Sequence, residues 1–271
     1  MKFKKIEFLK EALREDIGRG DLARFIVNGT STAFIRAKQD GILAGCEYIK
    51  HINEIADINI TFFKYDSDEI KKGDIICELK GDSKDLLSAE RTILDILQHA
   101  SGIATNANKY AKIAKNIQVL DTRKTRPLLR EFEKYASKVG GITNHRMGLD
   151  DCLMLKDTHL ALFDSISDAV SLARKNISFT TKIEVECETF EMTKEAMQNR
   201  VEIIMCDNMA EDEIKKVVKY RNENYPLTLI EVSGNITIET IEKYINLGID
   251  AVSSGSIIHQ ATFLDFSMKM K

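Results

Sequence analysis

Residues 121–156 concentrate positive charge in a chain of 271 residues whose formal net charge is −3. The basic side chains of this segment are Arg123, Lys124, Arg126, Arg130, Lys134, Lys138, His145, Arg146 and Lys156. Arginine forks bind carboxylates through paired hydrogen bonds, whereas lysine ammonium groups act as compact charges suited to phosphate. The rest of the chain has no basic stripe with interleaved aromatic rings, which argues against a nucleic-acid-binding protein. We therefore expect a small ligand with several negative charges.

Some of this charge has a simpler interpretation. The stretch 130–138, REFEKYASK, is predicted to be a helix whose Arg and Lys residues form a solvated face with i,i+4 pairing. For Arg123 and Lys124, which lie between two threonines, a plain surface turn is the weaker alternative. We expect His145, beside an arginine, to contact the ligand.

Acidic and small residues end later apolar runs. Glu186 and Asp207 end two successive runs, a placement that suits either a divalent metal or sugar hydroxyls. Because Glu184 and Glu186 share one face of a strand, one of them is alternatively only a salt-bridge partner. The small-residue loops SGN (233–235) and SSGS (253–256) are typical of backbone cradles for a phosphate.

The elements that must position these residues are short apolar runs that alternate with helical stretches. The runs are IQVLD, CLMLK, KIEVEC, EIIMCD, LTLIEVS and DAVSSG. Strands too apolar to have a solvated face predict a parallel sheet wrapped by helices. Six runs, with a seventh near 141–145, favour a barrel over an open doubly wound sheet, because barrel strand ends converge on one mouth.

The first third of the chain has a different pattern. Alternating apolar and polar residues with turn glycines predict an antiparallel sheet, followed by a helix over 85–115 whose weak point is Gly102. We therefore expect an N-terminal domain at 1–105, with the tail 261–271 packing back on it, and a barrel domain at 106–260. The first residues have helical rather than signal-peptide spacing, and no stretch suffices to span a bilayer. Five scattered cysteines predict buried thiols in a cytoplasmic protein, without a disulfide framework or zinc site.

At this point the residues resemble a known family, the quinolinate phosphoribosyltransferases, or carboxylating nicotinate-nucleotide pyrophosphorylases. The matching motifs include EDIGRGD, ERTILDILQHASGIAT, DTRKTRP, EKYASKVGGITNHRMGLDD, LKDTHL, EVEC, MCDN, EVSGN and GIDAVSSGSIIHQA. The resemblance implies transfer of phosphoribose from phosphoribosyl pyrophosphate to quinolinate, with release of pyrophosphate and carbon dioxide, in de novo NAD synthesis. It also implies Mg²⁺, no organic cofactor, and a fold with an open-faced α/β sandwich domain and an incomplete, about seven-stranded α/β barrel.

The resemblance also implies residue roles. It places Arg123, His145 and Arg146 at the quinolinate carboxylates, and Arg91 in the site of the neighbouring subunit of a homodimer, which could assemble further into a hexamer. The residues predicted to bind substrate are Arg91, Thr122, Arg123, His145, Arg146, Ser233, Gly234, Asn235, Ser254, Gly255 and His259. The residues predicted to be catalytic are Lys124, Lys156, Glu186 and Asp207, of which the last two are also predicted to hold Mg²⁺ through the substrate.

Three positions depart from the family pattern, and three other functions remain open. Leu128 stands where many relatives have Gly, Thr158 replaces a frequent Asn, and Asn235 stands where a second Gly is common. One alternative is a Schiff-base aldolase that uses Lys156. Another is a sensor that binds phosphoribosyl pyrophosphate without turnover, and the third is a relative that acts on nicotinate, against which the paired arginines argue.

Overall fold

The computed structural model describes residues 2–271, which form two compact units. The first unit comprises the residues up to Asn108 together with Tyr135–Gly141 and Gln260–Lys271. The second comprises Lys109–Lys134 and Ile142–His259. The sequence-based division at 105/106 did not include the excursion of Tyr135–Gly141 into the first unit.

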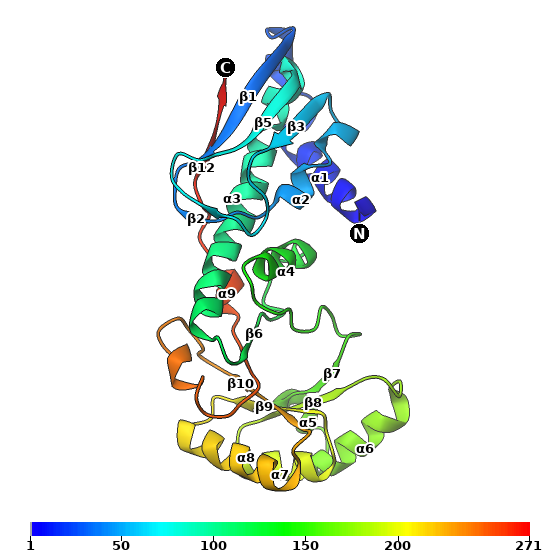
Figure 1. Cartoon of the computed structure of the whole chain (residues 1–271). Helices are drawn as coiled ribbons and strands as arrows, with labels where there is room; N and C mark the ends of the chain where they lie inside the picture. The colour runs from blue at the N-terminus through cyan, green and yellow to red at the C-terminus, as the bar shows by residue number, and fades with distance from the viewer. Residues whose placement is uncertain (1) are drawn as a thin grey trace. The chain divides into compact units, whose positions relative to one another are not determined.

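The first unit is built on an antiparallel sheet (Figure 1). Its elements are α1 (Lys2–Ile17), η1 (Leu22–Phe25), β1 (Thr30–Ala37), β2 (Gly41–Ile42), α2 (Cys46–Ile49), η2 (Ile52–Glu54), β3 (Ile58–Phe62), β4 (Glu69–Ile70), β5 (Ile75–Asp82), most of α3 (Ser83–Ile113), the end of α4 (Arg130–Val139) and β12 (Phe266–Met270). The main sheet has the order β12-β1-β5-β3, and β2 pairs separately with β4. Ala33, Ile35 and Ala37 of β1 are fully buried, as the period of two predicts.

The C-terminal strand closes one edge of this sheet. β12 pairs antiparallel with β1, with Ala33 opposite Met270. The chain approaches it across α3 at Gly102, where a Cβ would lie 2.0 Å from the carbonyl oxygen of Thr262. Glycine weakens a helix, but no larger residue fits under this crossing. The apparent weak point in the helix is therefore a packing requirement.

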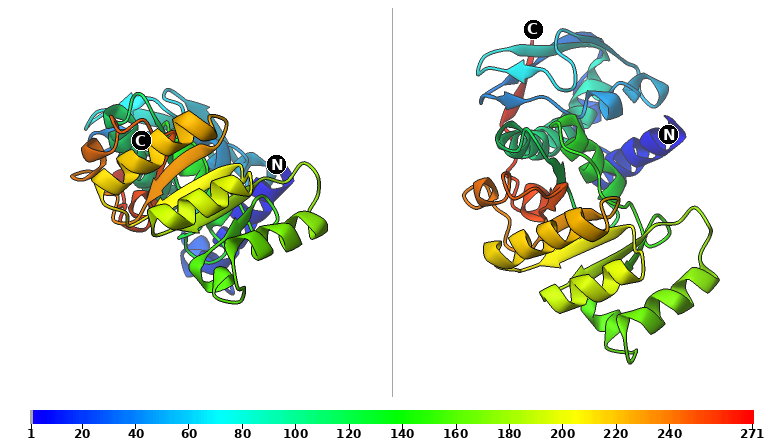
Figure 2. Two further views of the ribbon diagram at one scale, coloured as in Figure 1. Left: turned by 90° about the horizontal axis from the view of Figure 1, so that it is seen from below. Right: turned by 60° about the horizontal axis from the view of Figure 1, so that its bottom comes forward.

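The second unit is a parallel sheet covered by helices, which confirms the predicted α/β class (Figures 1 and 2). Its elements are β6 (Gln118–Leu120), β7 (Leu153–Leu155), α5 (Asp157–Leu160), α6 (Ile166–Asn176), β8 (Ile183–Cys187), α7 (Phe190–Gln198), β9 (Ile203–Asp207), α8 (Glu211–Asn224), β10 (Leu229–Ser233), η3 (Ile241–Lys243), β11 (Ala251–Ser253) and α9 (Ser256–His259). The helices α6, α7 and α8 lie along the outside of the sheet. Val185, Ile204 and Val232 are buried at its centre.

The barrel is incomplete between its two edge strands. The strand order is β6-β11-β10-β9-β8-β7, so the sheet has six strands rather than about seven. The expected seventh run contributes one bridge, from Thr143 to Leu120 of β6. Pairing stops there because the Asp121 side chain accepts hydrogen bonds from the next two residues, Asn144 and His145. This segment is therefore shaped as a loop.

The cysteines and the helices add two simple facts. All five cysteines are free thiols, and four of them are buried. Among residues 2–271, no helix combines the length and the apolar character required to cross a membrane.

Candidate active site

A cavity of about 480 Å³ opens at the carboxyl ends of the parallel strands. Most of the predicted site residues line it: Thr122, Arg123, Lys124, His145, Arg146, Lys156, Glu186, Asp207, Ser233, Gly234 and Asn235. In a parallel sheet these ends meet at one edge, which is why residues so far apart in sequence come together. The cavity is also lined by Met154, Met205, Asn208 and Ser253.

Four predicted residues lie outside the cavity lining. Arg91 is on α3 of the first unit, where it pairs with Asp95 at 3.3 Å. The hydroxyl of Ser254 donates to the carbonyl of Ile236 at 2.6 Å and is buried. Gly255 and His259 lie behind Lys124, because a Cβ on Gly255 would be 2.8 Å from Cδ of Lys124 and 3.2 Å from the His259 ring. Binding roles for these four stay predictions.

The two methionines in the lining were missed by the sequence reading. Met154 precedes Lys156 by two positions, and Met205 precedes Asp207 by two. Side chains two apart on a strand face the same side, so both methionines point inward below a charged residue. The alternation rule applied backward from each strand end would have found them.

Arg123 supplies positive charge at the cavity, and no acid among the described residues forms an ion pair with it. Its Nε is buried and has no hydrogen-bond partner among the described residues. Burial, together with the neighbouring guanidinium groups of Arg146 and Arg130, lowers the pKa of Arg123. Like charges held together at a cavity wall favour the binding of an anion. A surface turn, the weaker alternative for Arg123, does not describe this environment.

A buried hub holds the two cationic loops together. The carboxylate of Asp121 accepts from Lys134 Nζ at 2.5 Å, from Asn144 Nδ2 at 2.6 Å and from the His145 amide at 2.9 Å. Lys134 also donates to the carbonyl of Arg146 at 3.2 Å. The predicted solvated face of this helix was therefore wrong for Lys134, which is fully buried. The spacing of charges along a helix does not reveal an acceptor such as Asp121, which comes from another part of the chain.

Two carboxylates face the cavity with different partners. Glu186 contacts the ammonium of Lys156. Asp207 accepts from the amide of its neighbour Asn208 at 2.8 Å, and no ion pair joins it to a cation in the described residues. A carboxylate that already pairs with a lysine has less negative charge to offer a metal ion. Asp207, which has no such pair, is therefore the better candidate ligand for a divalent cation. Glu186 can contribute to the same cation only by sharing its oxygens with Lys156.

The loop conformations account for one departure from the family pattern, Asn235, and show a strained backbone at another, Leu128. Asn208 and Asn235 both adopt positive φ angles, 52° and 51°, and Asn235 Nδ2 donates to Asn208 Oδ1 at 3.1 Å. Asparagine is one of the few residues that adopt this left-handed conformation readily, so it replaces glycine there without severe strain. Leu128 also has a positive φ, 68°, and its side chain is fully exposed. Leucine gains nothing from this position that would offset its unfavourable backbone.

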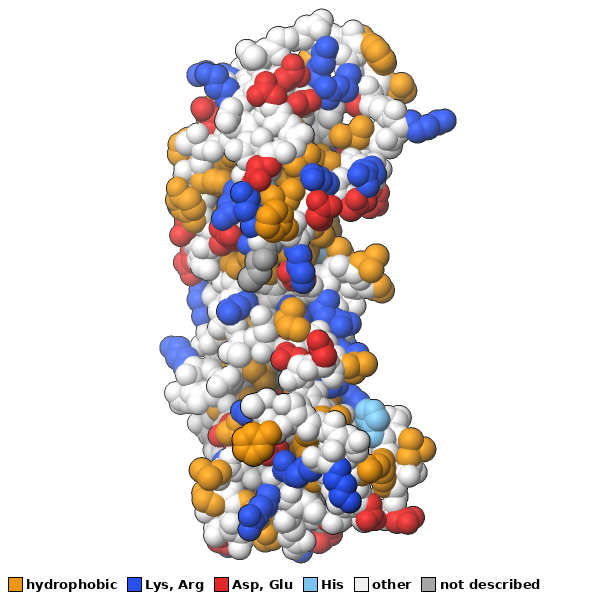
Figure 3. Space-filling view, turned by 90° about the vertical axis from the view of Figure 1, so that its right-hand side faces the viewer, with side chains coloured by type: hydrophobic (Ala, Val, Ile, Leu, Met, Phe, Trp, Pro, Cys, Tyr) orange, Lys and Arg blue, Asp and Glu red, His pale blue; other side chains and the backbone are white. Residues whose placement is uncertain are grey.

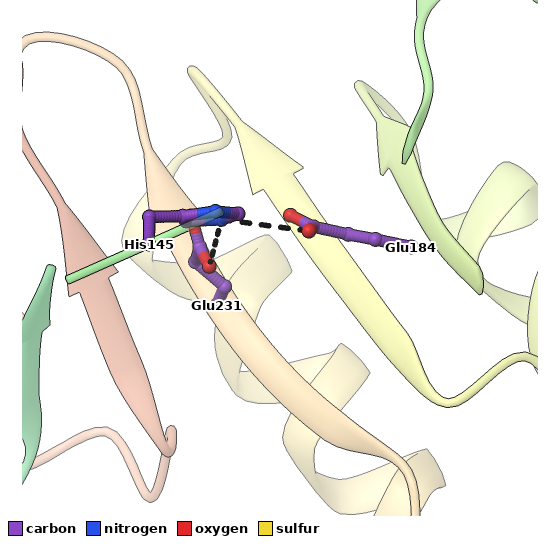
Figure 4. A group of neighbouring side chains, drawn as sticks. All are labelled: His145, Glu184 and Glu231. Carbon is purple, nitrogen blue, oxygen red and sulfur yellow. Dashed lines mark ion pairs between the residues drawn. The ribbon is translucent and has the colours of Figure 1, made fainter. Parts of the chain in front are cut away.

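His145 lies between the cavity and a second one at the amino ends of the strands. The second cavity is about 920 Å³ and is lined by His145, Arg146, Glu184 and Glu231 among others. His145 Nε2 is 3.4 Å from Glu184 Oε2 and 3.2 Å from Glu231 Oε2 (Figure 4). Burial lowers the pKa of His145, but the two carboxylates outweigh this effect and raise it to about 10.

Comparisons with known proteins agree with this architecture. The N-terminal domain of quinolinate phosphoribosyl transferase matches residues 21–101, and its C-terminal domain matches residues 103–269. The chain is 37% identical to the probable nicotinate-nucleotide pyrophosphorylase [carboxylating] of Methanocaldococcus jannaschii, over 97% of this chain and 96% of that one. It is 38% identical to the protein of the same name from Bacillus subtilis, over 97% and 92% of the two chains.

A solved structure gives the same result in three dimensions. The crystal structure of NadC from Streptococcus pyogenes superimposes with a TM-score of 0.92 at 38% identity, covering all of this chain and 98% of that one. Both domains, the full-length relatives and the shared fold lead to one conclusion: the chain belongs to the quinolinate phosphoribosyltransferase family.

Proposed function

We propose that this chain is a carboxylating nicotinate-nucleotide pyrophosphorylase, which converts quinolinate and phosphoribosyl pyrophosphate into nicotinate mononucleotide, pyrophosphate and carbon dioxide. The relatives of full length carry that name. The observation that supports it here is the cavity, which sets the uncompensated cation Arg123 opposite carboxylates and small-residue loops. A dicarboxylate requires the cationic side chains, and a phosphorylated sugar requires the carboxylates and the small-residue loops.

Quinolinate binds through its two carboxylates. Arg123, Arg146 and Lys124 provide the cationic wall, and the arginine forks orient planar carboxylates through paired hydrogen bonds. This orientation directs the ring nitrogen toward the anomeric carbon of the ribose. Fixing two reactants in this way removes much of the entropic barrier of a bimolecular step.

The transfer step forms a bond between the ring nitrogen and the anomeric carbon. The bond from that carbon to the pyrophosphate oxygen breaks, and its electron pair leaves with pyrophosphate. Positive charge develops on the ribose, where Glu186 and Asp207 stabilise it. Lys156 offsets the charge of the departing pyrophosphate, and the loops at Ser233, Gly234 and Gly255 hold the 5′-phosphate.

Decarboxylation needs no organic cofactor. The ribosylated ring nitrogen is cationic, so it stabilises the electron pair left on the adjacent carbon when the 2-carboxylate departs as carbon dioxide. That carbon then takes a proton. Asp207 would help to hold Mg²⁺ carried by phosphoribosyl pyrophosphate, and the ion would neutralise charge on the phosphates.

The alternative functions have less support. Lys156 contacts Glu186, and an ion-paired ammonium has no free electron pair with which to attack a carbonyl. The decisive experiment supplies purified protein with phosphoribosyl pyrophosphate, Mg²⁺ and either quinolinate or nicotinate. We expect release of pyrophosphate and carbon dioxide with quinolinate alone. Pyrophosphate from nicotinate alone would indicate a salvage enzyme, and no release from either would indicate a sensor.

We also propose that the enzyme acts as a homodimer in which Arg91 reaches the site of the partner copy, whether or not dimers assemble into a hexamer. Arg91 is 60% exposed on α3. In the same unit Leu22, Phe25 and Ile26 are exposed, and they follow Asp21, which accepts a hydrogen bond from Ser88 of α3. Hydrophobic side chains also interrupt the charged surface on the face shown in Figure 3. Exposed apolar patches of this kind mark protein interfaces.

Mixing two inactive variants tests this arrangement. In the proposed dimer each active site combines Lys156 of one protomer with Arg91 of its partner. A mixed dimer of Arg91→Ala and Lys156→Ala therefore has one site with both residues intact and one site with neither. We expect partial activity after the two inactive proteins are unfolded and refolded together. A mixture as inactive as its components would contradict the shared site.

A further inference from the structure

Two buried carboxylates lie beneath the cavity and have no role in the reaction described above. Glu184 of β8 is fully buried, and Glu231 of β10 is 3% exposed. Neither oxygen of Glu184 has a hydrogen-bond partner among the described residues, and neither does Oε1 of Glu231. Both side chains point toward the ring of His145, from the two strands that lie on either side of β9 (Figure 4).

The fold itself does not require acids at this depth. Glu184 lies two residues before Glu186 on the same strand face, and Glu231 lies two before Ser233. The equivalent positions of β7 and β9 are Met154 and Met205, which fill the interior without charge. Burying like-charged groups without hydrogen bonds destabilises a fold, and such groups persist mainly where they serve function.

The only side chain that pairs with both acids in the described structure is His145. In the neutral ring Nδ1 accepts the amide hydrogen of Arg146 at 2.7 Å, so the proton lies on Nε2. The imidazolium, which the raised pKa of His145 favours, has protons on both nitrogens and cannot accept that hydrogen. In either state an N–H group faces the carboxylates.

The same three residues could in principle hold a metal ion, since their ligand atoms lie within 4.8 Å of one another. A metal would need the lone pair of Nε2, and the Arg146 amide would then have to leave Nδ1 for that nitrogen to be protonated. Both protonation states of the ring already carry a proton on Nε2, so pairing of this N–H group with the two acids describes the cluster without a metal. The acids act on a proton-bearing ring.

The place of His145 shows what this pairing does. His145 and Arg146 line both cavities, whereas Glu184 and Glu231 line only the one at the amino ends of the strands. The acids therefore reach His145 from behind, away from the substrate side. A carboxylate that holds an imidazole N–H fixes the orientation and charge of the ring, as the acid of a catalytic triad does.

We propose that Glu184 and Glu231 are positioning residues for quinolinate: through their ion pairs with Nε2 of His145 they fix His145 and Arg146 against the floor of the substrate cavity. This inference rests on the proposed function, which places quinolinate in that cavity. The acids do not touch the substrate. They affect substrate binding by orienting His145 and, through it, the guanidinium of the next residue, Arg146.

The test uses the full-length protein with Glu184→Gln and Glu231→Gln, alone and combined with His145→Ala. We expect each single variant to raise the KM for quinolinate about 10-fold or more, with the KM for phosphoribosyl pyrophosphate changed less than about 2-fold. The melting temperature should stay the same or rise, because a buried charge is removed. In the His145→Ala background the two substitutions should have almost no further effect on the KM for quinolinate.

Glu202→Gln provides the matched control. Glu202 lies at the amino end of the same sheet, where it accepts from the Ile183 amide at 2.8 Å and pairs with Arg174 at 3.2 Å. Its loss should lower the melting temperature and leave both KM values unchanged. A purely structural carboxylate behaves in that way, so the control separates the two roles.

The outcomes separate this inference from the proposed function. If the wild-type protein does not turn over quinolinate, the proposed function fails. If it does, and Glu184→Gln and Glu231→Gln retain wild-type kinetics, the inference alone is overturned. It is also overturned if their effect is equally large without His145. Should Glu231→Gln not fold, Glu231→Met, which copies the residue at Met154 and Met205, gives the same comparison.

Discussion

Two layers of acidic side chains inside the second unit differ in which hydrogen-bond or ion-pair partners their carboxylate oxygens have. In the layer at the carboxyl ends, Glu186 contacts Lys156, and Asp207 accepts from Asn208. In the deeper layer, Glu184 and Glu231 are buried with oxygens that have no hydrogen-bond partner in the described structure. In the proposed function, the residues of the outer layer exchange these partners for substrate and metal. The deeper layer keeps its charge out of reach of substrate, and His145, which pairs with both deep acids, also lines the substrate cavity.

The largest expected effect is on the outer layer. Arg123→Ala removes the uncompensated guanidinium from the cavity wall, so we expect kcat/KM for quinolinate to fall by about 10²–10³-fold while the protein stays folded. Steady-state kinetics with a melting curve measure both. Arg174→Ala, which removes an exposed guanidinium paired with Glu202, is the control and should retain activity. A variant Arg123→Ala with unchanged KM and kcat would remove Arg123 from the site.

The next effect is on the hub that supports both layers. Lys134→Met leaves the buried carboxylate of Asp121 without its cation, and breaking a buried pair in this way costs about 3–5 kcal/mol. Denaturation by urea measures the loss in the free energy of unfolding. The double variant Lys134→Met with Asp121→Asn removes both charges and should recover part of that loss. If Lys134→Met unfolds at the wild-type urea concentration, the hub does not support the site.

A smaller effect is expected at the strained loop next to the cationic segment. Leu128→Gly relieves a positive φ that costs leucine about 1–2 kcal/mol, while glycine adds about 0.5–1 kcal/mol of unfolded-state entropy. We expect a net gain of roughly 0.5–1 kcal/mol in the free energy of unfolding, with the KM for both substrates unchanged. Leu128→Ala keeps a Cβ and should gain much less. A destabilised Leu128→Gly would mean that the leucine side chain has a partner that the isolated chain does not show.

Much of this architecture follows from patterns that are local in the sequence. The alternation of apolar runs and helices predicted the parallel sheet, and the polar residue after each run predicted the outer layer, because strand ends converge whatever their order. The deeper layer did not follow in the same way. The pattern E-V-E marks two acids on one face, but the meeting of Glu184 and Glu231 at His145 appears only in three dimensions, because β9 separates their two strands and His145 lies on a loop. Lys134 is a similar case, since its burial depends on Asp121, which comes from another part of the chain.

The smallest expected effect is on the alkylation rate of Cys152, whose thiol lies at the cavity on the amino ends of the strands. Cys152 lines the cavity at the amino ends of the strands and is the one cysteine that is not fully buried. Burial, with the negative charge of Glu184, raises the pKa of Cys152 to about 11. Because the thiolate is the reactive form, alkylation of the native protein should be slow at pH 7 and should rise about tenfold per pH unit toward that value. Quinolinate, which we place in the other cavity, should leave this rate unchanged, and protection of Cys152 by quinolinate would show that the two layers do not separate the substrate from the amino-end cavity.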